Sequence, residues 1–95
     1  MRYERYTVVI EPDEEEPHRF NVHVPALPGC LTYGESVDDA LANAVEAIRG
    51  YVAVVVAAGE PVPVERQPTI AAMIAVPLVD VPDVTERVAV ASGLE

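Results

Sequence analysis

The side chains best able to do chemistry in this chain are its carboxylates, because 16 acidic residues stand against 6 basic ones. Five of them share residues 11–17 with two prolines, in the order Glu-Pro-Asp-Glu-Glu-Glu-Pro. Carboxylate oxygens can bind a divalent cation. This segment, however, lacks the ligand spacing and the glycine of a calcium-binding loop. We therefore interpret it as a solvated loop between two strands.

Histidine and cysteine offer few further metal ligands. His18 and His23 are five residues apart, so on one strand they point to opposite faces and cannot share a metal. His23 belongs to the outward face, where a partner could meet it, although an exposed structural histidine is the simpler interpretation. Cys30 is the single cysteine, which excludes an internal disulfide and indicates a small buried residue. We expect no metal and no cofactor.

Nucleophilic and phosphate-binding motifs are also missing from the sequence. Ser36 has a structural role as a helix cap, which removes it as a candidate nucleophile. The five glycines stand singly, and no Gly-Lys-Ser/Thr motif occurs. The sequence supports no enzyme class. A degenerate metal-dependent nuclease would need carboxylates clustered at strand ends. We do not expect this activity, so a magnesium-dependent cleavage assay should show no product.

The charge balance favours a basic partner over a nucleic acid. The formal net charge is −10, and all six cations are arginines at scattered positions. Nucleic-acid binding depends on clustered cations that neutralise phosphates, so we expect none here. An acidic surface attracts a basic protein and speeds its encounter with this one. The simpler alternative is that the charge only keeps the chain soluble.

Targeting signals are not evident. No basic and apolar leader precedes the first expected strand. The apolar stretches are interrupted by Gly or Pro before they reach membrane-spanning length. We therefore expect a cytoplasmic protein that makes no membrane contact.

Three strands are expected in the first third of the chain. Residues 3–10 are rich in β-branched and aromatic side chains. Residues 18–24 alternate between apolar and polar, with the apolar set Phe20, Val22 and Val24 facing inwards. Pro28-Gly29 is a strong turn signal, and residues 30–33 can form a third, short strand. These strands should pair in antiparallel fashion.

A long helix should follow, over about residues 37–58. Ser36 can cap its start, and Asp39 occupies the acidic position of a capping box. Gly59 suits the position after the helix end. Gly50 should weaken the helix interior by up to ~1 kcal/mol, and we expect it to allow a close backbone contact. Apolar residues at helical spacing predict a stripe that covers the sheet: Val37, Leu41, Ala44, Val45, Ile48, Val52 and Val55.

The remaining residues complete a β-β-β-α-β order. Residues 69–76 fit a strand, which Pro77 confines to a sheet edge or ends. Residues 84–92 fit a short helix slightly better than a strand. This order predicts a two-layer α+β fold, in which a right-handed crossover lays the helix on one face of a three-stranded antiparallel sheet plus edge strand. We place one domain at residues 1–79 and a tail at residues 80–95, either a short helix or a dimer-pairing segment.

One stretch, residues 24–48, carries a specific motif. It contains Pro-x-Leu-Pro-Gly-Cys-x-Thr-x-Gly, a capped helix start and Ala-x-x-Asn-x-x-Glu-Ala-Ile. The motif positions in this chain are Pro25, Leu27, Pro28, Gly29, Cys30, Thr32, Gly34, Ser36, Ala40, Asn43, Glu46, Ala47 and Ile48. In these residues the chain resembles the HicB antitoxin family, and the resemblance extends over about residues 3–78.

The resemblance implies a partial ribonuclease H-like fold without that enzyme's carboxylate cluster. It also implies a partner, a basic HicA-like toxin that cuts mRNA, whose RNA-binding surface and catalytic residue the antitoxin covers without catalysing a reaction. Candidate contact residues are Glu35, Asp38, Asp39 and His23. Many HicB proteins add a DNA-binding domain, but too few residues follow Leu78 for one, so operator binding is not expected unless the tails join across a dimer.

A second interpretation is a solitary HicB-like homo-oligomer that serves as a scaffold or small-ligand module without a toxin. Exposed strand edges favour pairing between copies, as a homodimer or a higher oligomer. A toxin reading frame beside this one would distinguish the two interpretations.

Overall fold

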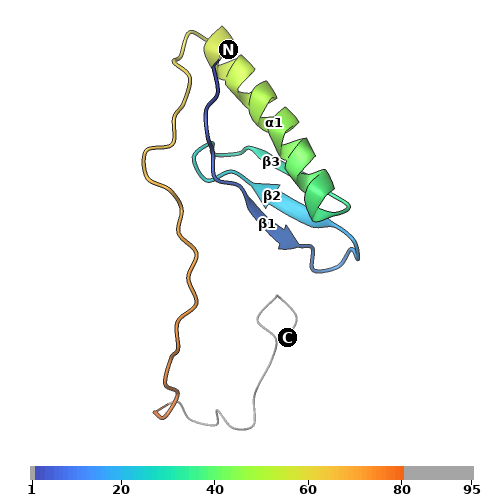
Figure 1. Cartoon of the computed structure of the whole chain (residues 1–95), viewed down its shortest axis with the longest axis vertical. Coiled ribbons are helices and arrows are strands. Elements are labelled where there is room, and N and C mark those ends of the chain that lie inside the picture. Colours follow the sequence, from blue (N-terminus) through green and yellow to red (C-terminus); the bar gives the residue numbers. More distant parts are fainter. Residues whose placement is uncertain (1, 81–95) are drawn as a thin grey trace.

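Alternation of apolar and polar side chains produces a small antiparallel sheet. The computed structural model describes residues 2–80, in the order β1 (Val9–Pro12), β2 (Phe20–His23), β3 (Leu31–Gly34) and α1 (Val37–Ala57). The strands lie in the order β1-β2-β3, and both pairs are antiparallel. Helix α1 lies across one face of this sheet (Figure 1). The predicted two-layer α+β class is confirmed.

The core lies between β2 and the first half of α1. Val22 is buried with Ala40 and Ala44, and Phe20 packs against them while partly exposed. Val24 is buried in a second cluster, beside the turn that precedes β3. The predicted inward set is therefore confirmed in orientation: Val22 and Val24 are buried and Phe20 is partly buried, although Val24 lies just after the end of β2.

The face that α1 turns to the sheet differs from the predicted stripe. Ala44 is buried as expected and Ile48, Val52 and Val55 are partly buried, but Val37, Leu41 and Val45 are exposed. The reason is the close approach of the two backbones at Gly34, where an added Cβ would lie 2.3 Å from the amide nitrogen of Ala40. Only a face of small side chains fits at that distance, so alanines rather than valines meet the sheet.

Both helix ends were predicted correctly within one residue. After the cap residue Ala58, Gly59 has a φ of 88°. Its amide donates to the Val56 carbonyl at 2.9 Å, and the Glu60 amide donates to the Val55 carbonyl at 3.1 Å. This pair of bonds is the Schellman arrangement, which satisfies carbonyls at the helix end.

Two expectations about α1 are wrong. A Cβ added at Gly50 would meet nothing within 4 Å, so this glycine permits no close contact. By length and composition α1 could also cross a membrane, contrary to the expectation that the apolar stretches are too short. Buried core helices pass the same test; Ala40 and Ala44 of α1 are packed against the sheet, although only 11% of its apolar window is buried. Its length is therefore weak evidence for a membrane span.

The first predicted strand is shorter than expected, since β1 begins only at Val9. The preceding residues instead contact the connector that follows α1. The Tyr6 hydroxyl donates to the Pro63 carbonyl. The backbone amide and the hydroxyl of Thr7 donate to the two carboxylate oxygens of Glu65, at 2.7 and 2.6 Å. These contacts hold the connector beside the N-terminal segment.

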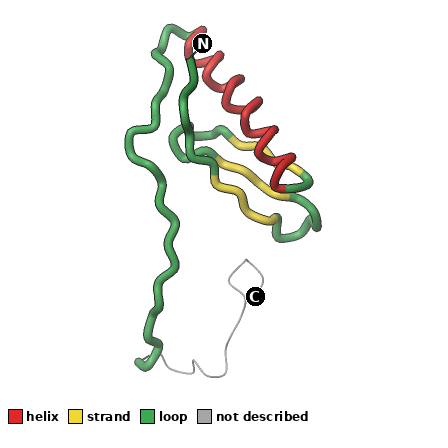
Figure 2. Tube along the Cα trace, in the orientation of Figure 1, coloured by secondary structure: helices red, strands yellow, loops and turns green. Residues whose placement is uncertain are grey.

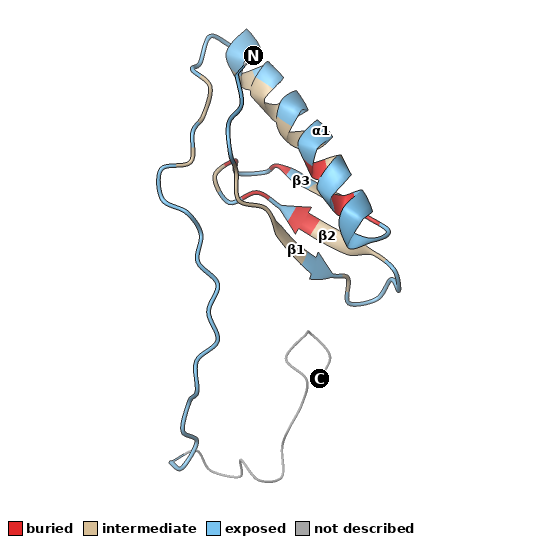
Figure 3. Ribbon diagram, viewed as in Figure 1, coloured by how far each residue is buried: buried red, intermediate tan, exposed pale blue. Residues whose placement is uncertain are grey.

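The predicted strand over residues 69–76 is absent, and with it the right-handed crossover. These residues are exposed and unpaired, and they run away from the sheet (Figure 2). A strand needs a neighbouring backbone to pair with, and beyond Glu65 the connector has none within the described chain. The colouring by burial shows the same contrast between the packed sheet and the exposed connector (Figure 3). Residues 84–92, and all but the first residue of the predicted tail at 80–95, lie outside the described residues.

Candidate functional site

The sheet register brings two acidic segments together. Pro12 pairs with Phe20, which also pairs with Gly34. The loop between β1 and β2 therefore lies at the same end of the sheet as the turn between β3 and α1 (Figure 1). Together with the end of β1 and the first turn of α1, these two segments hold eight of the chain's 16 acidic residues, which we call the acidic end: Glu11, Asp13, Glu14, Glu15, Glu16, Glu35, Asp38 and Asp39.

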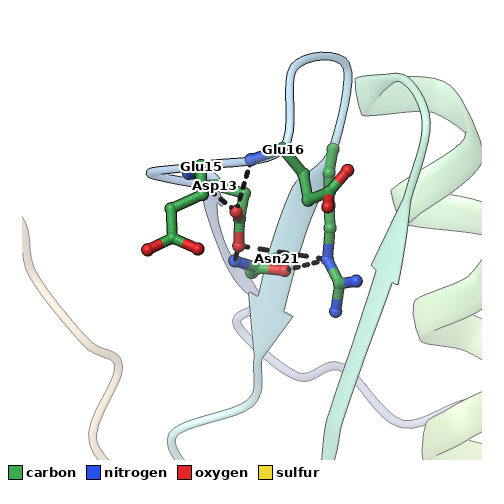
Figure 4. Close-up of polar contacts among 5 residues, drawn as sticks. Asp13, Glu15, Glu16 and Asn21 are labelled. Atoms are coloured by element: carbon green, nitrogen blue, oxygen red, sulfur yellow. Dashed lines mark hydrogen bonds and ion pairs between the residues drawn. The ribbon is translucent and has the colours of Figure 1, made fainter.

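Asp13 organises the longer of the two segments. One of its carboxylate oxygens accepts from the backbone amides of Glu15 and Glu16, at 2.9 and 2.8 Å (Figure 4). The other accepts from the Asn21 side-chain amide at 2.7 Å. The Asn21 bond, followed by the two backbone amides, lowers the pKa of Asp13 to about 2. The loop is exposed as predicted, but it is a hydrogen-bonded turn rather than a loose one.

Arg19 borders the acidic end and is held by contacts within the chain. Its Nε donates to the Asn21 side-chain oxygen at 2.9 Å and lies 4.0 Å from a carboxylate oxygen of Asp13. Its guanidinium carbon lies 3.9 Å from the centre of the Tyr33 ring, a cation–π distance. The positive charge is thus confined to the outer face of the sheet, and the carboxylates around it stay in excess.

The second acidic segment is fixed by the start of α1. The backbone amide of Asp39 donates to the Ser36 hydroxyl at 3.0 Å, and the Asp39 carboxylate accepts from the Glu35 amide at 2.8 Å. This is a capping box shifted by one residue, because the return bond reaches Glu35 instead of Ser36. Asp39 therefore has a structural role, while the side chains of Glu35 and Asp38 are exposed.

The histidines do not join the acidic end as a pair. His18 precedes β2 instead of lying on it, and it has a φ of 66°. His23 is exposed at the far end of β2, where it pairs with Val9 and Leu31. Of the four predicted contact residues, the structure brings together Glu35, Asp38 and Asp39 and separates His23 from them. A role of these residues in partner binding stays a prediction.

The motif residues between β2 and β3 form a tight turn. The Leu27 amide donates to the Val24 carbonyl at 3.0 Å, and the Cys30 amide donates to the Leu27 carbonyl at 2.9 Å. Gly29 has a φ of 84°, which favours glycine. Leu27 is 1% exposed, and the buried Cys30 has a pKa raised by desolvation. The predicted burial of Cys30 is confirmed.

Two side chains of α1 tie the helix to these motif segments. The Asn43 side-chain amide donates to the Tyr33 carbonyl at 2.7 Å. The Tyr51 hydroxyl donates to the Pro28 carbonyl at 3.0 Å. Ala47 and Ile48 pack against the cluster that contains Leu27. The motif thus positions the helix on the sheet, which explains most of its residues structurally.

Comparison with known proteins decides the family. The family described as HicB-like antitoxin of bacterial toxin–antitoxin system matches residues 6–92. The chain belongs to the HicB-like antitoxin family. A UPF0150 protein of Thermoplasma acidophilum is 50% identical to it over 48 residues, which cover 50% of this chain and 67% of the relative.

A solved structure supports the same conclusion for the HicB-like fold. The crystal structure of the N-terminal domain of Burkholderia pseudomallei antitoxin HicB superposes with a TM-score of 0.52 at 33% identity. The match covers 66% of this chain and 69% of that one. The resemblance predicted from the motif over residues 24–48 is confirmed.

Membership of an antitoxin family implies a toxin as partner and suggests a role without catalysis. Within residues 2–80, no group of three or more His, Cys, Asp or Glu residues is placed to hold a metal ion. Two carboxylates of the acidic end, Asp13 and Asp39, are already used by backbone amides. Asp13 and Asp39 therefore have structural roles within the acidic end.

Proposed function

We propose that this HicB-like chain neutralises a HicA-like toxin in the cytoplasm by covering the toxin's basic RNA-binding surface and catalytic residue. The observation that carries the proposal is the acidic end, where half of the chain's carboxylates lie on two neighbouring turns, the end of β1 and the first turn of α1. A surface that binds RNA is rich in cations. A dense, exposed set of carboxylates is complementary in charge to such a cationic surface.

The backbone of the acidic end is held before any partner arrives. Asp13 fixes one turn through two backbone amides, and Ser36 and Asp39 fix the other. A surface that is already ordered loses less conformational entropy on binding than a flexible one. The exposed carboxylates of Glu14, Glu16 and Glu35 can then contact cations without disturbing either turn.

Two variants with equal net charge test whether this end makes the contact. The first changes Glu14, Glu16 and Glu35 to Gln. The second changes three exposed acidic residues elsewhere to their amides: Glu46 and Glu60 to Gln, and Asp80 to Asn. Both remove three negative charges and spare Asp13 and Asp39, so they separate a local contact from the total charge of the chain.

Affinity for a HicA-like toxin encoded beside this chain is then measured by calorimetry at low and at physiological salt. We expect the first variant to weaken binding by about tenfold or more, because each charged side chain at the edge of an interface contributes up to ~1 kcal/mol. Salt screens these charges, so the loss of affinity should become smaller as the salt concentration rises. The second variant should change the affinity much less. Equal losses in both variants would mean that the acidic end makes no specific contact.

The alternative function is a homo-oligomeric scaffold without a toxin. It draws support from the exposed apolar residues 69–79 that follow the connector. A chain that shows no affinity for the neighbouring toxin, or that has no such neighbour, would favour this alternative.

A further inference from the structure

Helix α1 covers only one of the two faces of the sheet (Figure 1). Val22 points towards the helix, where it is buried with Ala40 and Ala44. Because alternate residues of a strand point to opposite faces, Asn21 and His23 point away from the helix. We call the face on which they lie the outer face.

Cross-strand pairing extends the outer face over all three strands. Residues that pair directly across two strands share a face of the sheet. The register therefore gives two rows of three residues: Val9, His23 and Leu31, then Glu11, Asn21 and Tyr33. In these rows Leu31 is 69% exposed and Tyr33 is 51% exposed. The β3 side of the outer face is thus a large apolar side chain next to an aromatic ring, both open to solvent.

Contacts between side chains connect the outer face to the acidic end. The guanidinium carbon of Arg19 lies 3.9 Å from the centre of the Tyr33 ring. The Arg19 Nε donates to the Asn21 side-chain oxygen at 2.9 Å, and the Asn21 amide donates to Asp13 of the acidic end (Figure 4). Tyr33 is therefore held in position before a partner arrives, which lowers the entropy that its contact would lose.

The charges at the outer face decide which partner it fits. Glu11 lies in one of the two rows, Asp13 is bonded beside it, and the rows contain no Lys or Arg. Nucleic acid would bring phosphates, which these carboxylates repel. A second copy would bring the same carboxylates on a chain whose net charge is also −10, and like charges across a contact cost several kcal/mol. A basic protein brings the opposite charge.

We propose, on the basis of the proposed function, that the outer face is the apolar centre of the contact with the basic toxin. Leu31 and Tyr33 pack against apolar side chains of the toxin, and the acidic end binds the cations beside them. Protein interfaces commonly combine an apolar centre with a polar rim, and Tyr is enriched among the residues that dominate binding. His23, which is separate from the acidic end, then lies at the opposite border of the same contact surface.

Substitutions at Leu31 separate an apolar contact from an effect of charge. Leu31→Lys adds a cation and Leu31→Glu adds an anion, but both replace the apolar side chain. Tyr33→Ala removes the ring and keeps the backbone carbonyl that accepts from Asn43. Matched controls are the Lys, Glu and Ala variants of Tyr3, which is 82% exposed in the segment before β1. Calorimetry measures the affinity of each full-length variant for a HicA-like toxin encoded beside this chain, and circular dichroism checks its fold.

We expect both Leu31 variants and Tyr33→Ala to weaken binding by about tenfold or more, equivalent to ~1.4 kcal/mol, and the Tyr3 variants to weaken it much less. Loss of affinity in Leu31→Lys but not in Leu31→Glu would mean that the outer face responds to charge alone, and would overturn the apolar centre. Wild-type affinity in all three outer-face variants would overturn it as well, while the proposed function would stand. A wild-type chain that does not bind the toxin would instead overturn the proposed function, and this proposal with it.

Amide chemical shifts of the wild type locate the contact without any substitution. We expect addition of the toxin to move the amide signals of Leu31 and Tyr33 strongly and that of Tyr3 little. Large shifts confined to α1 would place the toxin on the helical layer and contradict the proposal.

Discussion

Gly34 lies where β3 passes beneath the first turn of α1. A Cβ at this position would come within 2.3 Å of the Ala40 amide nitrogen and 2.6 Å of its Cα. Both are backbone atoms that cannot move without separating the helix from the sheet. Gly34 is therefore required by packing, and this accounts for its place in the family motif.

Gly34→Ala should destabilise the fold by about 3 kcal/mol or more, because the clash forces apart the two layers that bury Val22. Gly50→Ala is the matched control, since its added methyl group meets no atom within 4 Å and the helix gains propensity worth ~0.5–1 kcal/mol. Urea unfolding followed by circular dichroism measures both changes. A Gly34→Ala variant as stable as the wild type would contradict the packing argument.

Asp13 supplies a test of the acidic loop. Its pKa is lowered to about 2 from an ordinary 3.8. Because the folded value lies below the unfolded one, the ionised carboxylate stabilises the fold above pH 3.8, and this contribution is lost as the pH falls from 3.8 towards 2. A carboxyl ¹³C titration by NMR should therefore place the midpoint of Asp13 near 2.

The cause of that shift can be separated with two variants. The side-chain bond from Asn21 lowers the pKa most, and the charge of Arg19 contributes least. Asn21→Ala should move the Asp13 midpoint towards 3.8 by more than Arg19→Gln does. The reverse order would show that the Arg19 charge, and not the hydrogen-bonded turn, holds the carboxylate ionised.

At the scale of elements, the start of α1 depends on one hydroxyl. Ser36→Ala removes the acceptor for the Asp39 amide and should cost about 1 kcal/mol, whereas Ser36→Asn retains a capping oxygen and should stay close to the wild type. Thermal unfolding monitored at 222 nm compares the two. Equal stability of all three chains would mean that the cap contributes nothing.

Local chemistry explains which elements were predictable. Ser36 and Gly59 mark the ends of α1 through caps whose geometry depends on neighbouring residues, so the sequence predicted both ends. The face of α1 was not predictable from the spacing of apolar residues, because the tight contact at Gly34 favours alanines over larger valines. Residues 69–76 were mistaken for a strand because their composition is that of a strand, whereas no backbone within the described chain pairs with them.

For the site, the sequence indicated acidic residues but not their grouping. Glu35, Asp38 and Asp39 were expected to meet a partner, and the loop around Asp13 was considered separately. Only the pairing of Phe20 with both neighbouring strands shows that the two segments share one end of the sheet. Register depends on contacts across the sheet, which a single sequence does not display.

At the scale of the whole molecule, negative charge and apolar surface are segregated. Carboxylates gather at the acidic end, while uncharged surface lies on residues 69–79 and beside the second half of α1. In the proposed function the acidic end meets the toxin, so binding of the toxin should weaken as salt rises.

Inhibition of toxin cleavage in a purified system tests the central claim most directly. A HicA-like toxin encoded beside this chain is mixed with an mRNA substrate and an equimolar amount of the full chain. The proposal predicts that cleavage stops at one chain per toxin and returns in part when Glu14, Glu16 and Glu35 are changed to Gln. Full cleavage by the toxin in the presence of excess wild-type chain would contradict it.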